Sequence, residues 1–214
     1  MNHVYIHVAM MGNFEKIFTE LSQSINLSEL SVNSTINVGI VGGNIGSLNT
    51  PWNKFSSGNI SDFEFKTLSK MQQHAKLSEN DYYLYIHTKG VSTPDNPAID
   101  DWRKYMTYFC VEKWKDCINK LNEGADCVGV DWRTDPVPHY SGNFWWASGK
   151  HLSKLPDILA LGQPGAPHVL SVRHNAEFWI GMKPETKSVS LWDCGINQYS
   201  RHLHRYQKEN YANG

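Results

Sequence analysis

Two periods of hydrophobicity alternate along this chain. Residues 4–10, 36–41 and 82–86 form nearly continuous apolar runs, which predict buried β-strands. Between these runs, apolar residues recur every three or four positions, which is typical of amphipathic helices. The helical positions are Phe14, Ile17, Phe18, Leu21 and Ile25 in the first segment, and Phe65, Leu68, Met71 and Ala75 in the second. This order of elements predicts an α/β fold with a mostly parallel central sheet flanked by helices.

The second half of the chain continues the alternation. A loop with two prolines leads to the longest helical pattern, at residues 102–121, and Asp100 is its expected N-cap. Residues 126–130, 144–147 and 188–192 predict further short strands. No linker composition separates these segments, so we expect them to extend the same sheet.

Local signals predict where several elements begin and end. Asn13 precedes the first helix and can cap it. Ser61 and Glu64 have the spacing of a capping box for the second helix. Residues 42–58 are rich in glycine, asparagine and serine, so we expect a long loop there.

Composition fits one domain of moderate size. With 214 residues the chain can bury a substantial core, and we expect a single domain over residues 1–206. Residues 207–214 form a polar tail that would also serve as a linker to further domains. The net charge of −1 argues against a nucleic-acid-binding protein. No apolar run is long enough for a transmembrane helix, and the N-terminal residues lack the features of a signal peptide.

The four cysteines match no zinc or redox motif. Cys110 and Cys117 lie seven residues apart on a predicted helix, and Cys127 and Cys194 stand alone. We therefore expect buried free thiols rather than disulfides.

Chemistry-bearing residues gather after the predicted strands. They are Met10, Gly12 and Asn13 after the first strand, His87, Thr88, Lys89 and Gly90 after the strand at 82–86, and Asp131 and Arg133 after a later one. Open parallel sheets bind their ligands at the carboxyl ends of the strands. We therefore expect these residues to line one cleft.

The segments around these residues resemble nucleotide-sugar glycosyltransferases of the GT-A type over roughly residues 3–200. Lys-Thr-Leu-Ser-Lys at 66–70 resembles the helix that enters the Asp-x-Asp strand of glycogenin-like enzymes, and residues 84–89 fall on that strand. Tyr-Ser-Gly-Asn-Phe-Trp-Trp at 140–146 resembles the segment that floors the donor-sugar site. The amino-acid sequence of these segments is still more similar to rhamnan-synthesis-type bacterial transferases and to the N-terminal domain of a chlorella-virus glycosyltransferase. The resemblance implies a GT-A-like, Rossmann-type fold.

The chain departs from this family at the metal motif, where Asp-x-Asp is replaced by His87-x-Lys89. A lysine is a compact charge suited to phosphate, so Lys89 would hold the donor diphosphate, either instead of Mn or Mg or together with that cation. His87 would donate to a phosphate, ligate the metal, or serve only as a loop histidine. Gly90 would let the backbone approach the ligand closely.

The resemblance also assigns roles to other residues. The further donor-binding residues are Met10, Gly12, Asn13, Thr67, Thr88 and Asn143. The acceptor-binding residues are His139, Trp145 and Trp146, and because side chains alternate along a strand, only one of the two tryptophans should face the cleft. Glu177, on a short helix, is the first choice for the catalytic carboxylate. Asp131 is the second choice, as a base, a metal ligand or an acceptor from sugar hydroxyls, with capping of a turn as its structural alternative.

These features predict the transfer of a hexose or deoxyhexose (glucose or rhamnose) from a nucleotide sugar, UDP-linked, to a glycan acceptor, with retention of configuration. We expect no nucleic-acid partner, no membrane span and a cytoplasmic location, in the host if the protein is viral. The main alternative is a non-catalytic carbohydrate-binding domain. A metal-dependent hydrolase fits poorly, because none of the ten histidines forms a His-x-His or HExxH-type pair on a convincing element.

Overall fold

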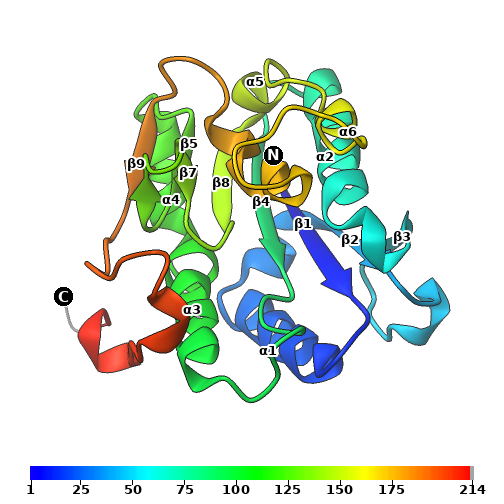
Figure 1. The fold of residues 1–214 in the computed structure, drawn as a ribbon, viewed down its shortest axis with the longest axis vertical. Helices are drawn as coiled ribbons and strands as arrows, with labels where there is room; N and C mark the ends of the chain where they lie inside the picture. The colour runs from blue at the N-terminus through cyan, green and yellow to red at the C-terminus, as the bar shows by residue number, and fades with distance from the viewer. Residues whose placement is uncertain (213–214) are drawn as a thin grey trace.

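A seven-stranded sheet forms the centre of the computed structural model, which describes residues 1–212 (Figure 1). The strand order is β3-β2-β1-β4-β8-β5-β9. The strands are β1 (Asn2–Ala9), β2 (Ser34–Val41), β3 (Asn53–Gly58), β4 (Tyr82–His87), β5 (Cys127–Gly129), β8 (Trp145–Ser148) and β9 (Ser188–Ser190). All neighbours pair in parallel except β8, which runs antiparallel to β4 and β5. The expected α/β fold with a mostly parallel sheet is confirmed.

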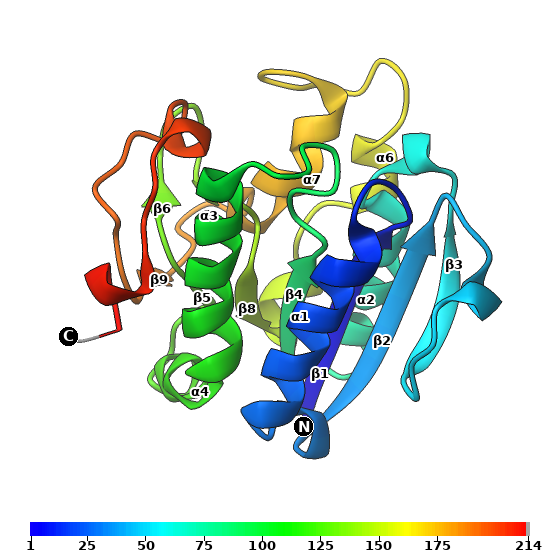
Figure 2. The ribbon, with the colours of Figure 1, turned by 90° about the horizontal axis from the view of Figure 1, so that it is seen from below.

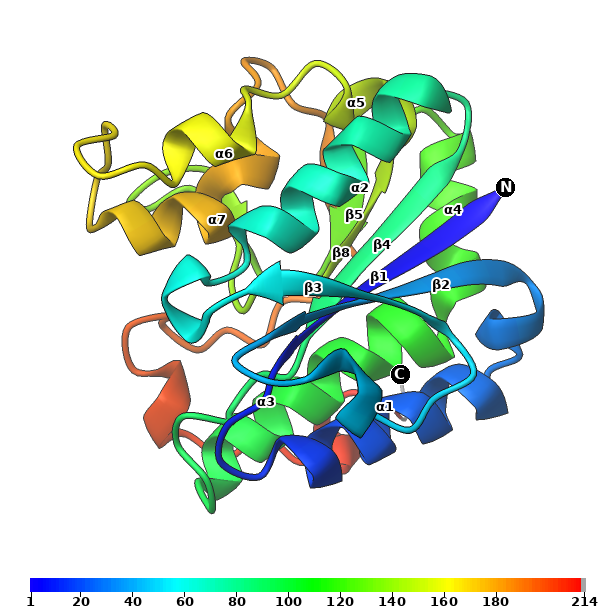
Figure 3. The ribbon, with the colours of Figure 1, turned by 90° about the vertical axis from the view of Figure 1, so that its right-hand side faces the viewer.

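Helices cover both faces of the sheet (Figures 2 and 3). One face carries α1 (Phe14–Leu27), α3 (Pro97–Thr107) and α4 (Trp114–Asn122). The other face carries α2 (Phe65–Leu77), α5 (Gly149–Leu152), α6 (Ile158–Leu161) and α7 (Asn175–Phe178). A separate two-stranded ribbon joins β6 (Trp132–Arg133) to β7 (His139–Tyr140). Each face of the sheet therefore has its own hydrophobic core.

Short helical turns connect many of these elements. The 3-10 turns are η1 (Leu30–Val32), η2 (Ile45–Ser47), η3 (Ile60–Asp62), η5 (Val172–His174), η6 (Trp179–Gly181), η7 (Arg201–Leu203) and η8 (Lys208–Asn210), and η4 (Tyr108–Glu112) is a π-helical turn. None of the helices in residues 1–212 is both long enough and apolar enough to span a lipid bilayer.

The position of strand β8 in the sheet determines where the side chains of its two neighbouring tryptophans lie. Trp145 packs with Tyr85 on the α2 side, and Trp146 lies in the core on the α3 side, where its indole N–H donates to the carbonyl of Cys110 at 2.7 Å. Both side chains are 0% exposed. The prediction that one of them faces the cleft is wrong, because alternation sends the two rings to opposite faces and helices cover both faces.

Two predicted boundaries are also wrong, for local reasons. Residues 53–58 form the edge strand β3 within the expected loop, since backbone pairing with β2 does not require apolar side chains. Helix α3 begins at Pro97, and the side chain of Asn96, not that of Asp100, accepts the N–H groups of Ala98 and Ile99.

The long helical pattern and the cap of α1 also differ from expectation. The π-helical turn η4 interrupts residues 102–121, so α3 and α4 are separate helices. Asn13 lies at the start of α1 but makes no capping bond with its side chain.

The described C-terminal residues pack against the domain instead of forming a free polar tail. Tyr211 is 5% exposed, and its ring lies 5.1 Å from that of Tyr105. Residues 207–212 therefore belong to the folded body, while 213–214 of the expected tail lie outside the described residues. All four cysteines carry free thiols, as expected, but Cys194 is only half-buried.

The buried position of Trp146 generates a stability prediction. Trp146→Ala should lower the free energy of unfolding by about 3–5 kcal/mol, because it removes a fully buried indole and leaves a cavity. Chemical denaturation measures the change. Leu77→Ala is the control, since Leu77 is 87% exposed and its truncation should change stability by less than about 0.5 kcal/mol. Equal stabilities of the two variants would contradict the packing described for β8.

Candidate functional site

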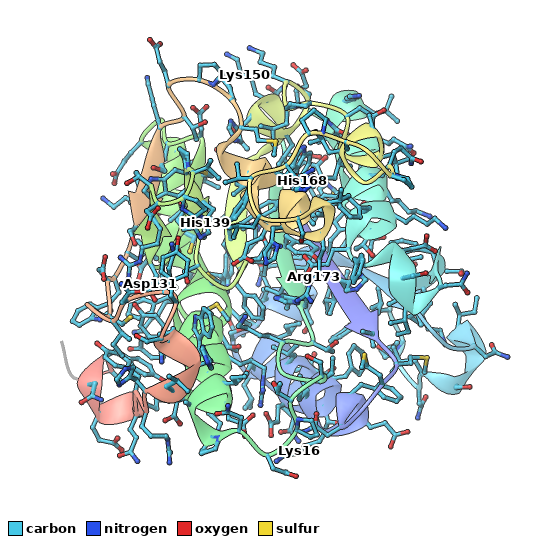
Figure 4. All side chains as sticks on the ribbon, in the orientation of Figure 1. Lys16, Asp131, His139, Lys150, His168 and Arg173 are labelled. Carbon is cyan, nitrogen blue, oxygen red and sulfur yellow. The ribbon has the colours of Figure 1, made fainter. Side chains whose placement is uncertain are left out.

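Two adjoining cavities lie at the carboxyl end of β4. The first, the β4 cavity, measures about 330 Å³ and is lined by residues including His7, Glu64, His87 and Arg173. The second, the α7 cavity, measures about 180 Å³ and is lined by residues including His139 and Glu177. Lys89 lines both cavities. Figure 4 shows Arg173 over the end of β4 and His139 beside it.

Two of the larger hollows elsewhere contain charged groups that are already paired. One of about 740 Å³ contains Arg133 and Asp193, which already form an ion pair. Another of about 570 Å³ lies between α1 and the C-terminal turn, where Arg103 is paired with Glu20. Charged groups that are already paired gain less from a new ligand.

Lys89 is the central cation of the site. Its ammonium nitrogen lies 3.9 Å from the centroid of the Trp102 ring, a cation–π contact. It has no carboxylate within 4.0 Å among residues 1–212. Burial lowers the pKa of Lys89, and the charges of Glu177 and Glu64 oppose that shift. A partly buried cation without a close counter-ion favours an anionic ligand.

Glu64 occupies the N-cap position of α2, but its side chain lines the β4 cavity and makes no capping bond. The capping box belongs to the preceding turn, where Asn59 and Asp62 exchange hydrogen bonds, so the predicted box at Ser61 and Glu64 is wrong. One carboxylate oxygen of Glu64 accepts from the Tyr85 hydroxyl at 2.8 Å and from the Asn143 amide at 2.7 Å. Glu64 thus joins the start of α2 to β4 and to the turn before β8.

His87 is held on one side by backbone and faces a carboxylate on the other. Its Nε2 donates to the carbonyl of Gly142 at 3.1 Å, and its Nδ1 lies 3.6 Å from Oε1 of Glu64. Burial and the charge of Lys89 lower the pKa of His87 to about 3. His87 is therefore a neutral imidazole near pH 7, with Nδ1 as its acceptor nitrogen.

Glu177 stands across the α7 cavity on helix α7, as the sequence predicted for a short helix. Its Oε1 accepts the backbone N–H of Gly142 at 3.1 Å. Gly142 thus contacts both sides of the site. Its N–H donates to Glu177, and its carbonyl accepts from His87. A side chain at Gly142 would clash, because a Cβ there would lie 2.5 Å from the sulfur of Met106 and φ is +93°.

His139 and Asn143 are both buried but differ in availability. His139 lines the α7 cavity, and its Nδ1 donates to the carbonyl of Val137 at 2.7 Å. Asn143 has φ of +61°. Its amide nitrogen donates to Glu64, and its amide oxygen accepts the indole N–H of Trp145. Asn143 therefore positions Glu64 instead of offering free polar atoms to a sugar.

Of the other predicted donor-binding residues, Thr67 supports the site from behind, while Thr88 and Gly90 line the β4 cavity. Thr67 is buried and hydrogen-bonds Nδ1 of His7 at 2.9 Å, which leaves the other ring nitrogen of His7 for the β4 cavity. Burial lowers the pKa of His7 to about 4. Thr88 lines the β4 cavity, and its hydroxyl accepts the N–H of Ala9 at 3.2 Å. Gly90 also lines it, with φ of +98°.

The turn after β1 packs against the loop after β4. At Gly12 a Cβ would lie only 2.0 Å from the carbonyl oxygen of Val91, so only glycine fits. The Met10 side chain lies against Gly43, and Oδ1 of Asn13 is buried without a hydrogen-bond partner within residues 1–212. Met10, Gly12 and Asn13 do not line either cavity. The lining of the cavities therefore gives no support to the predicted donor-binding role of these three residues.

Asp131 lies apart from both cavities, near the C-terminal segment, as Figure 4 shows. Its carboxylate accepts the N–H of Cys194 at 2.8 Å and faces Arg133 at 3.3 Å. Burial raises the pKa of Asp131. Asp131 and Cys194 form, with Asp193, the one three-ligand cluster with metal-like spacing in residues 1–212, but Arg133 and backbone N–H groups already engage its oxygens.

Sequence patterns did not indicate three residues of the β4 cavity. Glu64 was predicted to belong to a capping box, His7 is hidden within an apolar strand, and Arg173 lies in the short turn η5 with no motif. His7 could have been noticed in the alternating side chains of β1, because a histidine at a buried strand position needs a polar partner.

Comparison with known proteins gives one positive result. No curated protein matches the chain at a significant level. A family model, described as a domain of unknown function (DUF8361), matches residues 44–163, which is more than half of the chain. The matched segment includes Glu64, His87, Lys89 and Asn143 but ends before Arg173 and Glu177. The chain therefore belongs to the family described as domain of unknown function DUF8361.

Proposed function

We propose that the protein is a nucleotide-sugar glycosyltransferase of the GT-A type. One observation carries the proposal: Lys89, a cation without a close carboxylate, lies between two adjoining cavities at the carboxyl end of the central strand. A sugar-transfer enzyme needs a place for a donor, a place for an acceptor, and positive charge where the diphosphate leaves. The mostly parallel sheet, with its ligand edge at β1 and β4, is compatible with this fold class.

In this proposal the β4 cavity takes the donor. Lys89 and Arg173 stand at its walls and would pair with the diphosphate oxygens. Oε1 of Glu64 and Nδ1 of His87 face the cavity as acceptors and would receive sugar hydroxyls. The positive charge of Lys89 and Arg173, which has no carboxylate within 4.0 Å among residues 1–212, would then stabilise the leaving group.

The α7 cavity takes the acceptor. Glu177 presents one oxygen that is bonded to Gly142 and a second that has no hydrogen-bond partner within residues 1–212. This carboxylate would orient or deprotonate an acceptor hydroxyl, or stabilise the anomeric centre if configuration is retained. The volume of about 180 Å³ suits one sugar unit at a time.

The residues at the His-x-Lys position do not form a cage for a divalent cation. His87 and Glu64 bring two ligand atoms to 3.6 Å, and no third histidine, cysteine or carboxylate within residues 1–212 completes that set. We propose that the fixed charge of Lys89 takes the metal's part at the diphosphate. Donor specificity is proposed as a UDP-linked hexose or deoxyhexose, with glucose and rhamnose as candidates and a glycan as acceptor.

The proposed role of Lys89 predicts a pH dependence. Burial places the pKa of Lys89 below its ordinary value of 10.5, so the charge is lost at a lower pH than for an exposed lysine. Affinity for UDP should therefore fall as pH rises through that lowered pKa. Lys89→Arg should flatten this loss relative to the wild type, because arginine stays charged and the titration of UDP itself is common to both proteins. Identical pH profiles would refute the role.

Removing the charge of Lys89 should weaken the binding of UDP. Lys89→Met should reduce UDP affinity by roughly 10-fold or more, measured by calorimetry, since a partly desolvated charge-assisted contact is lost. Lys150→Met is the matched control, because Lys150 is exposed and lies at the far end of the molecule in Figure 4. Wild-type affinity in Lys89→Met would count against the donor site.

Glu177 should matter for turnover rather than for donor binding. Glu177→Gln should lower the rate of sugar transfer by about 10²–10⁴-fold and leave UDP affinity within a factor of about three. The rate is measured as consumption of labelled UDP-glucose and UDP-rhamnose with glycan acceptors. Glu185→Gln, at an exposed glutamate outside both cavities, is the control. Full activity of Glu177→Gln would remove Glu177 from the mechanism.

A further inference from the structure

Phe63 has a backbone conformation that side chains rarely adopt. Its φ is +46° and its ψ is −137°, a region that is normally restricted to glycine. The ring is 39% exposed, so burial does not explain why a large aromatic residue stands there. Strain of this kind persists only where the surrounding structure enforces it, and it gathers at functional sites.

The surrounding turn enforces the strain. The turn η3 is closed by the capping box of Asn59 and Asp62, and the N–H of Phe63 donates to the carbonyl of Ile60 at 3.1 Å. Helix α2 begins two residues later, at Phe65. Figure 3 shows this connection between β3 and α2 at the same end of the sheet as α7.

The conformation aims two consecutive side chains at the same cavity. Phe63 and Glu64 both line the β4 cavity, the ring at the exposed mouth and the carboxylate at the floor. In an ordinary extended backbone, successive side chains point in opposite directions. The positive φ of Phe63 thus places an apolar aromatic ring above the polar groups that the site already contains.

At the mouth of the cavity, the aromatic ring of Phe63 lies next to the guanidinium group of Arg173. Met11 and Ile60 line the same cavity beside Phe63 and are partly exposed. The guanidinium carbon of Arg173 lies 5.7 Å from the centroid of the Phe63 ring. Arg173 makes no ion pair among the residues that the structure describes. A flat apolar surface next to an unpaired arginine suits a ligand in which a planar ring is joined to phosphate.

We propose that Phe63 is the stacking platform for the base of the nucleotide donor. This inference rests on the proposed function. The base would lie on the ring of Phe63, the phosphates would reach Arg173 and Lys89, and the remainder of the donor would extend toward Glu64. Aromatic stacking discriminates ligands with a base from ligands without one, because the contact needs a π-face. Phe63 therefore determines selectivity for nucleotides over simple polyphosphates.

The test compares three substitutions of Phe63 and two ligands. Phe63→Ala and Phe63→Gly should each weaken UDP binding by about 10-fold in calorimetry, because both remove the ring, while Phe63→Trp should stay within about threefold of wild type. Inorganic pyrophosphate, which lacks a base, should bind all four proteins equally. Equal pyrophosphate affinity also shows that the phosphate end of the site is intact in each variant.

Thermal unfolding of the same proteins tests the strain. Phe63→Gly should melt about 2 °C or more above Phe63→Ala, because both lack the ring but only glycine adopts this backbone conformation freely.

A merely structural phenylalanine would leave UDP affinity unchanged on truncation, and this outcome overturns the inference alone. A wild-type protein that binds pyrophosphate but no nucleoside diphosphate also overturns it. Binding of neither ligand overturns the proposed function as well.

Discussion

The geometry of the site depends on the hydrogen bonds that the carboxylate of Glu64 accepts. It receives hydrogen bonds from Tyr85 on β4 and from Asn143 in the turn before β8, and it stands at the first residue before α2. Three segments that are distant in the sequence are thereby fixed at one point. A partly buried carboxylate needs such donors, and each donor would be left unpaired without it. The positions of His87 and Gly142 follow from this arrangement.

The same arrangement separates the charges of the site into two groups. Glu64 and Glu177 are both hydrogen-bonded to the segment around Gly142 and Asn143, so their negative charge is held by backbone and amide donors. Lys89 is left against the ring of Trp102, without a close carboxylate. In the proposed function, a fixed cation beside two carboxylates that are each anchored through one oxygen neutralises the leaving diphosphate without a metal ion.

Patterns in the sequence predicted those features that depend on local periodicity. The apolar strand β4 and the helices α1 and α2 follow from continuous or three-to-four-residue apolar spacing, and the ends of the strands did locate Lys89 and His87 in one cleft. The edge strand β3 was missed because its polar residues pair through the backbone. The role of Glu64 was missed because it depends on the φ of Phe63 and on contacts with residues up to 79 positions away. Tertiary contacts of this kind leave no local pattern.

The most direct test of the account is a calorimetric titration of the wild-type protein with UDP in the presence of EDTA. If Lys89 supplies the charge that holds the diphosphate, UDP should bind with a stoichiometry of about one, and added manganese should change the affinity by less than about threefold. UDP binding that appears only after manganese is added would contradict the central role of the fixed cation. Absence of UDP binding in both conditions would contradict the donor site itself.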